Sequence, residues 1–225
     1  MIAPKYQHVR IHPWIGSQYR NVKGLFKSRL LILGESEYQT HKGQEESWED
    51  SIWCIRRFIE GKTPEDKFSG KFFSNITTML LGLEAKTKEG RAFVWESIGF
   101  YNYIQRQVGI GPKAQATPEM WNERAAKLGF REVLQNLDPQ YIIVLGFENW
   151  NWIGKADADA HCITATPPAN SNWNDIRKLC WFNTPTGRAL SVGIKHPAVA
   201  FNAQKWHKWL LTAFPDVFAS AGGDI

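Results

Sequence analysis

The hydrophobic residues of this chain fall into short continuous runs that alternate with stretches of helical spacing. The run Leu-Leu-Ile-Leu at 30–33 contains no polar residue, which is typical of a strand buried on both faces of a parallel sheet. Further strands rich in β-branched and aromatic residues are predicted at 97–105, 141–145, 180–183 and 188–194.

Helices are predicted where apolar residues recur every three or four positions. The segments with this spacing are 47–59, 72–83, 118–137, 147–154 and 202–214. The third begins at Thr117-Pro118-Glu119, where a hydroxyl N-cap precedes a proline at the first helical position. Because helices alternate with strands, the sequence predicts an α/β fold built on a mostly parallel sheet.

One domain is predicted to span the 225 residues. Residues 1–28 show no clear period and are expected to form an irregular basic arm, and the tail at 219–225 is expected to fray. No apolar run approaches the roughly 20 residues of a membrane helix. The first ten residues lack the apolar core of a signal peptide. We therefore expect a cytoplasmic monomer that does not bind membranes.

Charge and cysteines narrow the expected partners. The net charge is +5, and Lys and Arg gather at 1–34 and 195–208. A basic face suits a polyanion such as nucleic acid, although ordinary surface charge explains the same numbers. Cys54, Cys162 and Cys180 are odd in number and show no Cys-x-x-Cys spacing. That pattern argues for reduced thiols and against a metal or iron–sulfur cofactor.

Polar residues follow the ends of three predicted strands. Gly34-Glu35-Ser36-Glu37-Tyr38 follows the first, Asn102 lies towards the end of the second, and His196 comes directly after Lys195, beyond the last. Ligands of open α/β sheets bind beyond the carboxyl ends of the strands, so these groups are expected to share a cleft. The pair Phe72-Phe73 follows a glycine loop and could form a stacking wall.

In this order the residues resemble the motifs of the uracil-DNA glycosylase superfamily. Its members carry G-Q-D-P-Y or G-E-A-P-G after the first strand, an asparagine at the end of the second, and His-Pro near the carboxyl end. This chain has Gly34-Glu35-Ser36-Glu37-Tyr38, Tyr101-Asn102-Tyr103 and His196-Pro197-Ala198. The resemblance covers roughly 30–210 and is closest to the cluster-bearing branch, without its four cysteines. It implies a three-layer α/β/α fold with a central, mostly parallel four-stranded sheet, a DNA partner and no cofactor.

The activity implied by this resemblance is hydrolysis of the N-glycosidic bond of uracil, or of a related deaminated base, flipped out of DNA. Asn102 would read the base with its amide, which offers a donor and an acceptor side by side. Phe73 would stack on the base. His196 would donate a hydrogen bond to O2 as negative charge develops on the departing base. Glu35 would position the attacking water.

The remaining site residues are assigned by the same resemblance. Gly34 would let the substrate approach the backbone. Tyr38 matches a position whose ring blocks the methyl group of thymine in one family. Lys195, Val199 and Phe201 would contact DNA, and a side chain from this segment would enter the base stack as a wedge.

Two departures from the motifs leave alternatives open. Ser36 stands where one family has its water-activating Asp, and Glu37, which could instead repel phosphate, stands where both patterns have Pro. Loss of a general base costs about 10²- to 10⁴-fold in rate. A catalytically impaired module that binds nucleic acid or senses damage is therefore an alternative. A remote alternative is a serine hydrolase with Ser36 as nucleophile, although Tyr38 replaces the second glycine of that motif.

Structural roles compete with several of these assignments. Asn102 could simply bond backbone groups at the end of its strand, and Glu35 could be a surface carboxylate. Of Phe72 and Phe73, one is expected to belong to the hydrophobic core.

Overall fold

The computed structural model describes residues 6–21, 24–39, 47–62, 67–111, 114–156, 161–163, 179–198 and 200–218, with side chains except at 67–69, 154–156 and 161–163. Within these ranges a seven-stranded sheet has the order β1-β4-β2-β6-β9-β8-β7. In that order the strands are Trp14–Ile15, Gly99–Asn102, Leu30–Gly34, Tyr141–Leu145, Gly187–Ile194, Leu179–Thr184 and His161–Ile163. A separate sheet pairs β3 (Glu37–Gln39) with β5 (Gln107–Ile110).

The four central strands, β4, β2, β6 and β9, run parallel. All four were predicted, and they form the parallel centre of a larger mixed sheet. Strands β1, β8 and β7 extend it as antiparallel neighbours. Of these only β8 was predicted, because β1 and β7 have two and three residues, too few to show a period.

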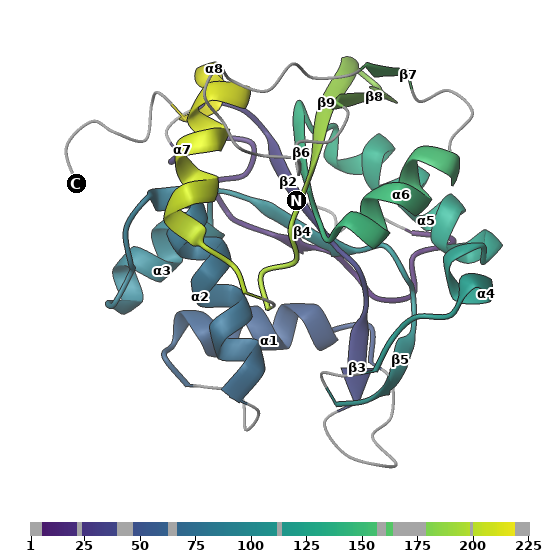
Figure 1. The fold of residues 1–225 in the computed structure, drawn as a ribbon, viewed down its shortest axis with the longest axis horizontal. Coiled ribbons are helices and arrows are strands. Elements are labelled where there is room, and N and C mark those ends of the chain that lie inside the picture. Colours follow the sequence, from purple (N-terminus) through teal and green to yellow (C-terminus); the bar gives the residue numbers. More distant parts are fainter. Residues whose placement is uncertain are drawn as a thin grey trace.

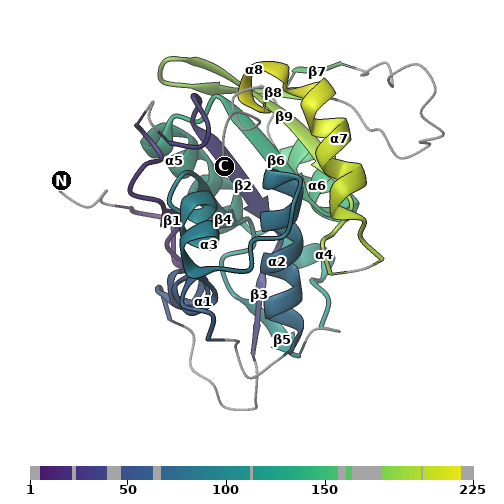
Figure 2. The ribbon, with the colours of Figure 1, turned by 90° about the vertical axis from the view of Figure 1, so that its left-hand side faces the viewer.

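Helices cover both faces of the sheet (Figures 1 and 2). One face carries α1 (Asp50–Ile59), α2 (Lys67–Leu81), α3 (Lys88–Trp95), α7 (Ala203–Ala213) and α8 (Pro215–Phe218). The other carries α4 (Pro118–Trp121), α5 (Arg124–Leu137) and α6 (Phe147–Ala156). In the described part of the chain, no helix is both long and apolar enough to cross a bilayer.

The continuous apolar run of β2 is explained by this layering. Leu30 and Ile32 belong to the hydrophobic cluster on one face, and Leu31 and Leu33 belong to the cluster on the other. All four side chains are fully buried. Successive residues of a strand point to opposite faces, so a strand covered on both sides needs an apolar residue at every position.

Three local expectations are corrected. The helix predicted at 118–137 is split into α4 and α5, because Glu123 has a non-helical backbone (φ −57°, ψ 128°). The arm expected to be irregular contains β1, which pairs with β4. Cys180 is disulfide-bonded rather than reduced, while Cys54 forms no disulfide within the described residues. The residue opposite Cys180 in the antiparallel register is Cys162.

A glycine in β9 lets α6 lie close to the sheet. A Cβ on Gly193 would come within 2.5 Å of Cγ of Trp150, a buried side chain of α6. Gly193 pairs with Val144 of β6, the strand that leads into α6. This contact therefore sets how closely the start of α6 approaches the carboxyl ends of the strands.

Replacing Gly193 by alanine should lower the free energy of unfolding by about 1–3 kcal/mol, because an added methyl group overpacks a filled core. Urea denaturation measures the change. Gly90→Ala in α3 is the matched control, since its Cβ would lie 3.3 Å from the nearest atoms and alanine favours helix by about 1 kcal/mol. Equal free energies of unfolding for both variants would contradict the role given to the Trp150 contact.

Candidate functional site

The order of the parallel strands places a switch point between β2 and β6. From β2 the chain passes to β4 on one side and then to β6 on the other. In open α/β sheets such a reversal marks where ligands bind, beyond the carboxyl ends of the strands. Gly34 ends β2 and Gly146 follows β6, so these two glycines flank the candidate site.

Asn149 of α6 joins the two strand ends at the switch point. Its Nδ2 donates to the carbonyl oxygen of Gly34 at 2.9 Å and lies 3.3 Å from that of Leu145. The side chain is fully buried, and its Oδ1 has no partner among the described residues. Sequence reasoning missed this residue. The available signal was a polar residue three positions after Gly146, on the first turn of a helix that follows a buried strand.

Gly34 and Asn102 are brought together, as predicted. They are register partners at the ends of β2 and β4, and Asn102 is buried. A Cβ on Gly34 would lie 2.1 Å from Oδ1 of Asn102. Glycine is therefore required here to make room for the Asn102 amide, which is a different reason from the close substrate approach that was expected.

Glu37 lies against Asn102. Its Oε1 accepts a hydrogen bond from Nδ2 of Asn102 at 2.7 Å and another from Oγ of Ser51 at 2.6 Å. Ser51, a buried residue of α1, was not predicted, although its place on the inner face of that helix was visible in the sequence. Repulsion of phosphate was one possible role for Glu37, and the sequence did not predict its bond to the Asn102 amide.

The strand β3 explains where Glu37 and Tyr38 point. Glu37–Gln39 form the extended strand β3, which pairs with β5 and which the sequence did not predict. Side chains alternate along a strand, so the side chain of Tyr38 leaves the backbone on the opposite face from that of Glu37. The expectation that Tyr38 lines the base pocket gains no support from this geometry.

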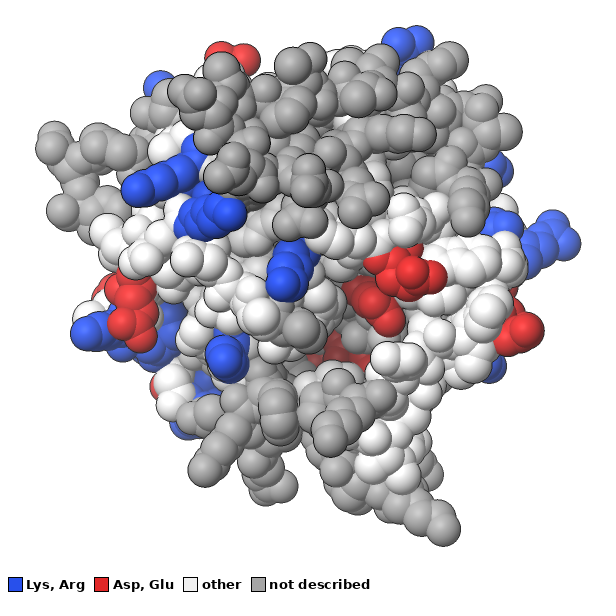
Figure 3. Space-filling view, viewed as in Figure 1, with Lys and Arg blue, Asp and Glu red and all other residues white. Residues whose placement is uncertain are grey.

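Glu35 is held at the same edge of the sheet. Its backbone oxygen accepts from the amide of Ile104 at 2.8 Å. Burial, and after it the neighbouring Glu148, raise the pKa of its carboxyl group. Glu148 belongs to α6 and accepts a hydrogen bond from Nε1 of Trp152 at 2.7 Å. Figure 3 shows acidic side chains gathered beside a hollow on this face, with Lys and Arg side chains on its other side.

His196 reaches the switch point from β9. A Cβ on Gly146 would lie 3.6 Å from Cδ2 of His196 and 3.9 Å from Cβ of Asn149. Burial lowers the pKa of His196 to about 4, so the ring is neutral at pH 7. The amide of Ala198 donates to Nδ1 at 3.3 Å. The single ring proton of the neutral form therefore lies on Nε2, which makes that nitrogen a donor.

The serine-hydrolase alternative finds no support in these contacts. Within the described part of the chain, no hydrogen bond joins the hydroxyl of Ser36 to His196. A general base needs an unprotonated nitrogen directed at the nucleophile. In His196 the unprotonated Nδ1 already accepts from the backbone of Ala198.

Of the two adjacent phenylalanines, Phe72 and not Phe73 lies at the site. The ring centroid of Phe72 is 5.4 Å from that of His196. Phe73 is 6% exposed and packs against Trp95 and Phe58 at centroid distances of 5.3 and 5.6 Å. One member of the pair was expected in the core, and that member is Phe73, which had been assigned to stacking.

The segment after β9 is placed only in part. Lys195 directly follows the strand and is partly exposed at its carboxyl end. Val199 lies outside the described residues. Phe201 is partly buried and stacks on Trp206, with centroids 6.2 Å apart and an interplanar angle of 12°. Phe201 is thus packed onto α7, and its role as a wedge stays a prediction.

Two arginines of the amino-terminal arm lie far from this site. Arg29 directly precedes β2 and pairs with Asp138 at 2.9 Å. Arg20 donates to the carbonyl oxygen of Asn136, at the end of α5. Both therefore lie at the amino ends of the parallel strands, opposite the candidate site. These two side chains therefore add no positive charge at the candidate site.

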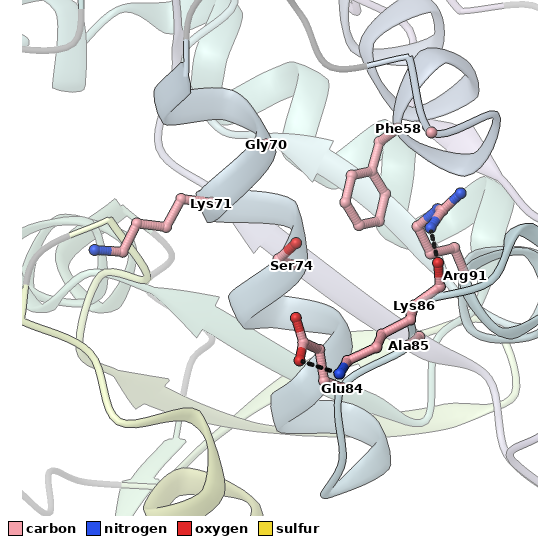
Figure 4. A pocket seen from close by; sticks show the side chains of 9 residues that line it. Phe58, Gly70, Lys71, Ser74, Glu84, Ala85, Lys86 and Arg91 are labelled. Atoms are coloured by element: carbon pink, nitrogen blue, oxygen red, sulfur yellow. Dashed lines mark hydrogen bonds and ion pairs between the residues drawn. The ribbon is translucent and has the colours of Figure 1, made fainter.

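A separate pocket of about 420 Å³ lies on the outer side of α2 (Figure 4), and none of the predicted site residues lines it. Arg91 in its wall already donates to the carbonyl oxygens of Ile59 and Lys86 at 3.1 and 2.8 Å. Lys86 pairs with Glu84 at 3.8 Å. In Figure 4 the side chain of Lys71 points away from the other labelled side chains. The carboxyl ends of the strands are therefore the stronger candidate site.

Within the described ranges, no three His, Cys, Asp or Glu residues are grouped so that they could hold a metal ion. The candidate site brings together two carboxyl groups, of Glu35 and Glu37, the buried amides of Asn102 and Asn149, the neutral imidazole of His196 and the ring of Phe72. No protein-family model matches the sequence, and no curated protein matches it.

Proposed function

We propose that the protein hydrolyses the N-glycosidic bond of uracil, or of a related deaminated base, in DNA, on a fold like that of uracil-DNA glycosylases. The observation that carries the proposal is the arrangement around the switch point. Gly34 and Asn102 lie side by side, and Asn149 links the end of β2 to the neighbourhood of His196. These are positions at which the motif resemblance expects a base to be held.

His196 suits the stabilisation of the leaving base. Cleavage leaves an electron pair, and hence negative charge, on the departing ring and its O2. A fixed donor aimed at developing charge is the usual source of such stabilisation. The proton on Nε2 supplies that donor, so a charged imidazolium is not required. Burial disfavours the charged form and holds the pKa of His196 near 4. Phe72, beside this ring, replaces Phe73 as the proposed stacking residue.

Glu35 suits the positioning of the attacking water. In the proposed step, water adds to the sugar carbon, the bond to the base breaks, and the carboxylate accepts the proton that water loses. Ser36 lacks a carboxylate, so this role falls to Glu35, whose raised pKa reflects a partly desolvated group. A carboxyl group with a raised pKa is the stronger base once it is ionised.

Replacing His196 by alanine should lower the rate of uracil release about 10²- to 10³-fold, because one donor to the leaving group is lost. The assay incubates single- and double-stranded uracil oligonucleotides with the protein and then cleaves abasic sites with alkali. Affinity for the same oligonucleotides should stay nearly unchanged. His207→Ala is the matched control, since His207 bonds the backbone of Met79 in α2 instead.

An unchanged rate in the His196 variant would remove this residue from the mechanism. A wild-type protein that releases no deaminated base, yet binds oligonucleotides in a salt-dependent way, would favour the nucleic-acid-binding alternative.

The rate of base release should also fall as pH drops through the raised pKa of Glu35, because the carboxylate must be ionised to accept a proton. Glu148 contributes to that raised pKa. In Glu148→Gln the pKa should fall, and the acid limb of the pH–rate profile should therefore move to lower pH. An acid limb that stays in place, or moves to higher pH, would show that Glu35 does not control the rate.

A further inference from the structure

Glu37 has no task in the proposed mechanism, yet it is bonded to the residue that reads the base. The glycosylase motifs carry proline at its position, so the resemblance assigns it no role. Its Oε1 accepts from Nδ2 of Asn102 and from Oγ of Ser51. Ser51 is 1% exposed and Asn102 is 4% exposed, so the partly buried carboxylate of Glu37 is bonded to two residues of the interior beside the site.

These contacts decide which way round the amide lies. The oxygen and nitrogen of an asparagine amide are nearly equal in size, and the hydrogen-bond network selects the orientation. A carboxylate only accepts, so the NH₂ group must face Glu37. The reversed amide would set its oxygen against the oxygen of Glu37. A hydrogen bond to an ionised group is roughly twice as strong as a neutral one, and the orientation is accordingly well determined.

The amide oxygen therefore faces the other way, towards the site. It lies against Gly34 at the end of β2, and Cζ of Phe100 is near the same point. The Phe100 ring is 6.3 Å from that of Phe72, which lies beside His196. The hydrogen bonds of Asn102 to side chains of the described residues involve its Nδ2 or its backbone oxygen, and none of them is donated to this oxygen. It is an acceptor directed at the place where the base is proposed to bind.

We propose that Glu37 is a positioning residue that fixes the Asn102 amide with its oxygen towards the base, so that the site selects bases with a ring N–H on their pairing edge. This inference rests on the proposed function. Deamination creates such a group: cytosine and adenine have a bare ring nitrogen there, whereas uracil and hypoxanthine have N–H. The Asn102 oxygen accepts from the N–H and repels the lone pair of the parent base.

The test compares Glu37→Leu, which removes the acceptor, with Glu37→Gln, which keeps an acceptor oxygen and the side-chain length. Wild type should favour uracil over cytosine by at least about 10²-fold, as expected where a site bonds one base and is left unpaired with the other. In Glu37→Leu the uracil-to-cytosine ratio of excision rates should fall at least tenfold. Glu37→Gln should keep the wild-type ratio.

A second ratio separates this role from a general loss of structure. Thymine carries the same ring N–H as uracil, so the uracil-to-thymine ratio should be equal in all three proteins. Thermal melting checks folding, and Glu37→Ala replaces the leucine variant if that variant does not fold. The inference would be overturned if Glu37→Leu kept the wild-type uracil-to-cytosine ratio. It would also be overturned if the uracil-to-cytosine and uracil-to-thymine ratios fell together in that variant.

Binding of free bases keeps the inference apart from the proposed catalysis. Titrations of each protein with free uracil and free cytosine, followed by NMR, should show the same preference and its loss in Glu37→Leu. If wild type cleaves no oligonucleotide but shows this pattern, the proposed activity fails and the role of Glu37 stands. If wild type excises uracil and the variants keep its preference, the proposed activity stands and the role of Glu37 fails. If free uracil and free cytosine bind equally, or neither binds, the role of Glu37 is overturned.

Discussion

The structure depends on one constraint, which is that its four parallel strands are buried on both faces. Helices close over each side of the sheet, so the buried positions of these strands are mostly apolar. Polar side chains that serve a common purpose can then meet only beyond the strand ends. The switch point between β2 and β6 provides that place, and segments distant in sequence converge on it.

The same enclosure sets the electrostatic character of the site. Removal of water disfavours charged forms, which raises the pKa of Glu35 and lowers that of His196. Burial thereby keeps the imidazole neutral, as the proposed hydrolysis requires, and makes the carboxylate of Glu35 a stronger base once it is ionised. Arg29 and Arg20, bonded at the far ends of the strands, do not offset this effect.

Much of the fold was readable from the sequence because it follows from periodicity. The parallel strands and most helices have enough residues to show a pattern, and Asn102 and His196 were correctly placed at strand ends. Strand β3 was missed because three polar residues paired with β5 show no hydrophobic period. That omission hid the contact between Glu37 and Asn102. The choice between Phe72 and Phe73 depends on the rotation of α2, which spacing leaves undetermined.

The bonds of Asn149 bear on how a substrate could enter. By tying the carbonyl groups at the ends of β2 and β6, the residue keeps the floor of the site at a constant width. Its own buried oxygen lacks a partner, at a cost of about 1–3 kcal/mol. A rigid floor of this kind would select a ligand by its shape and its hydrogen-bonding groups. Any conformational change on binding would then occur in the segments around the floor.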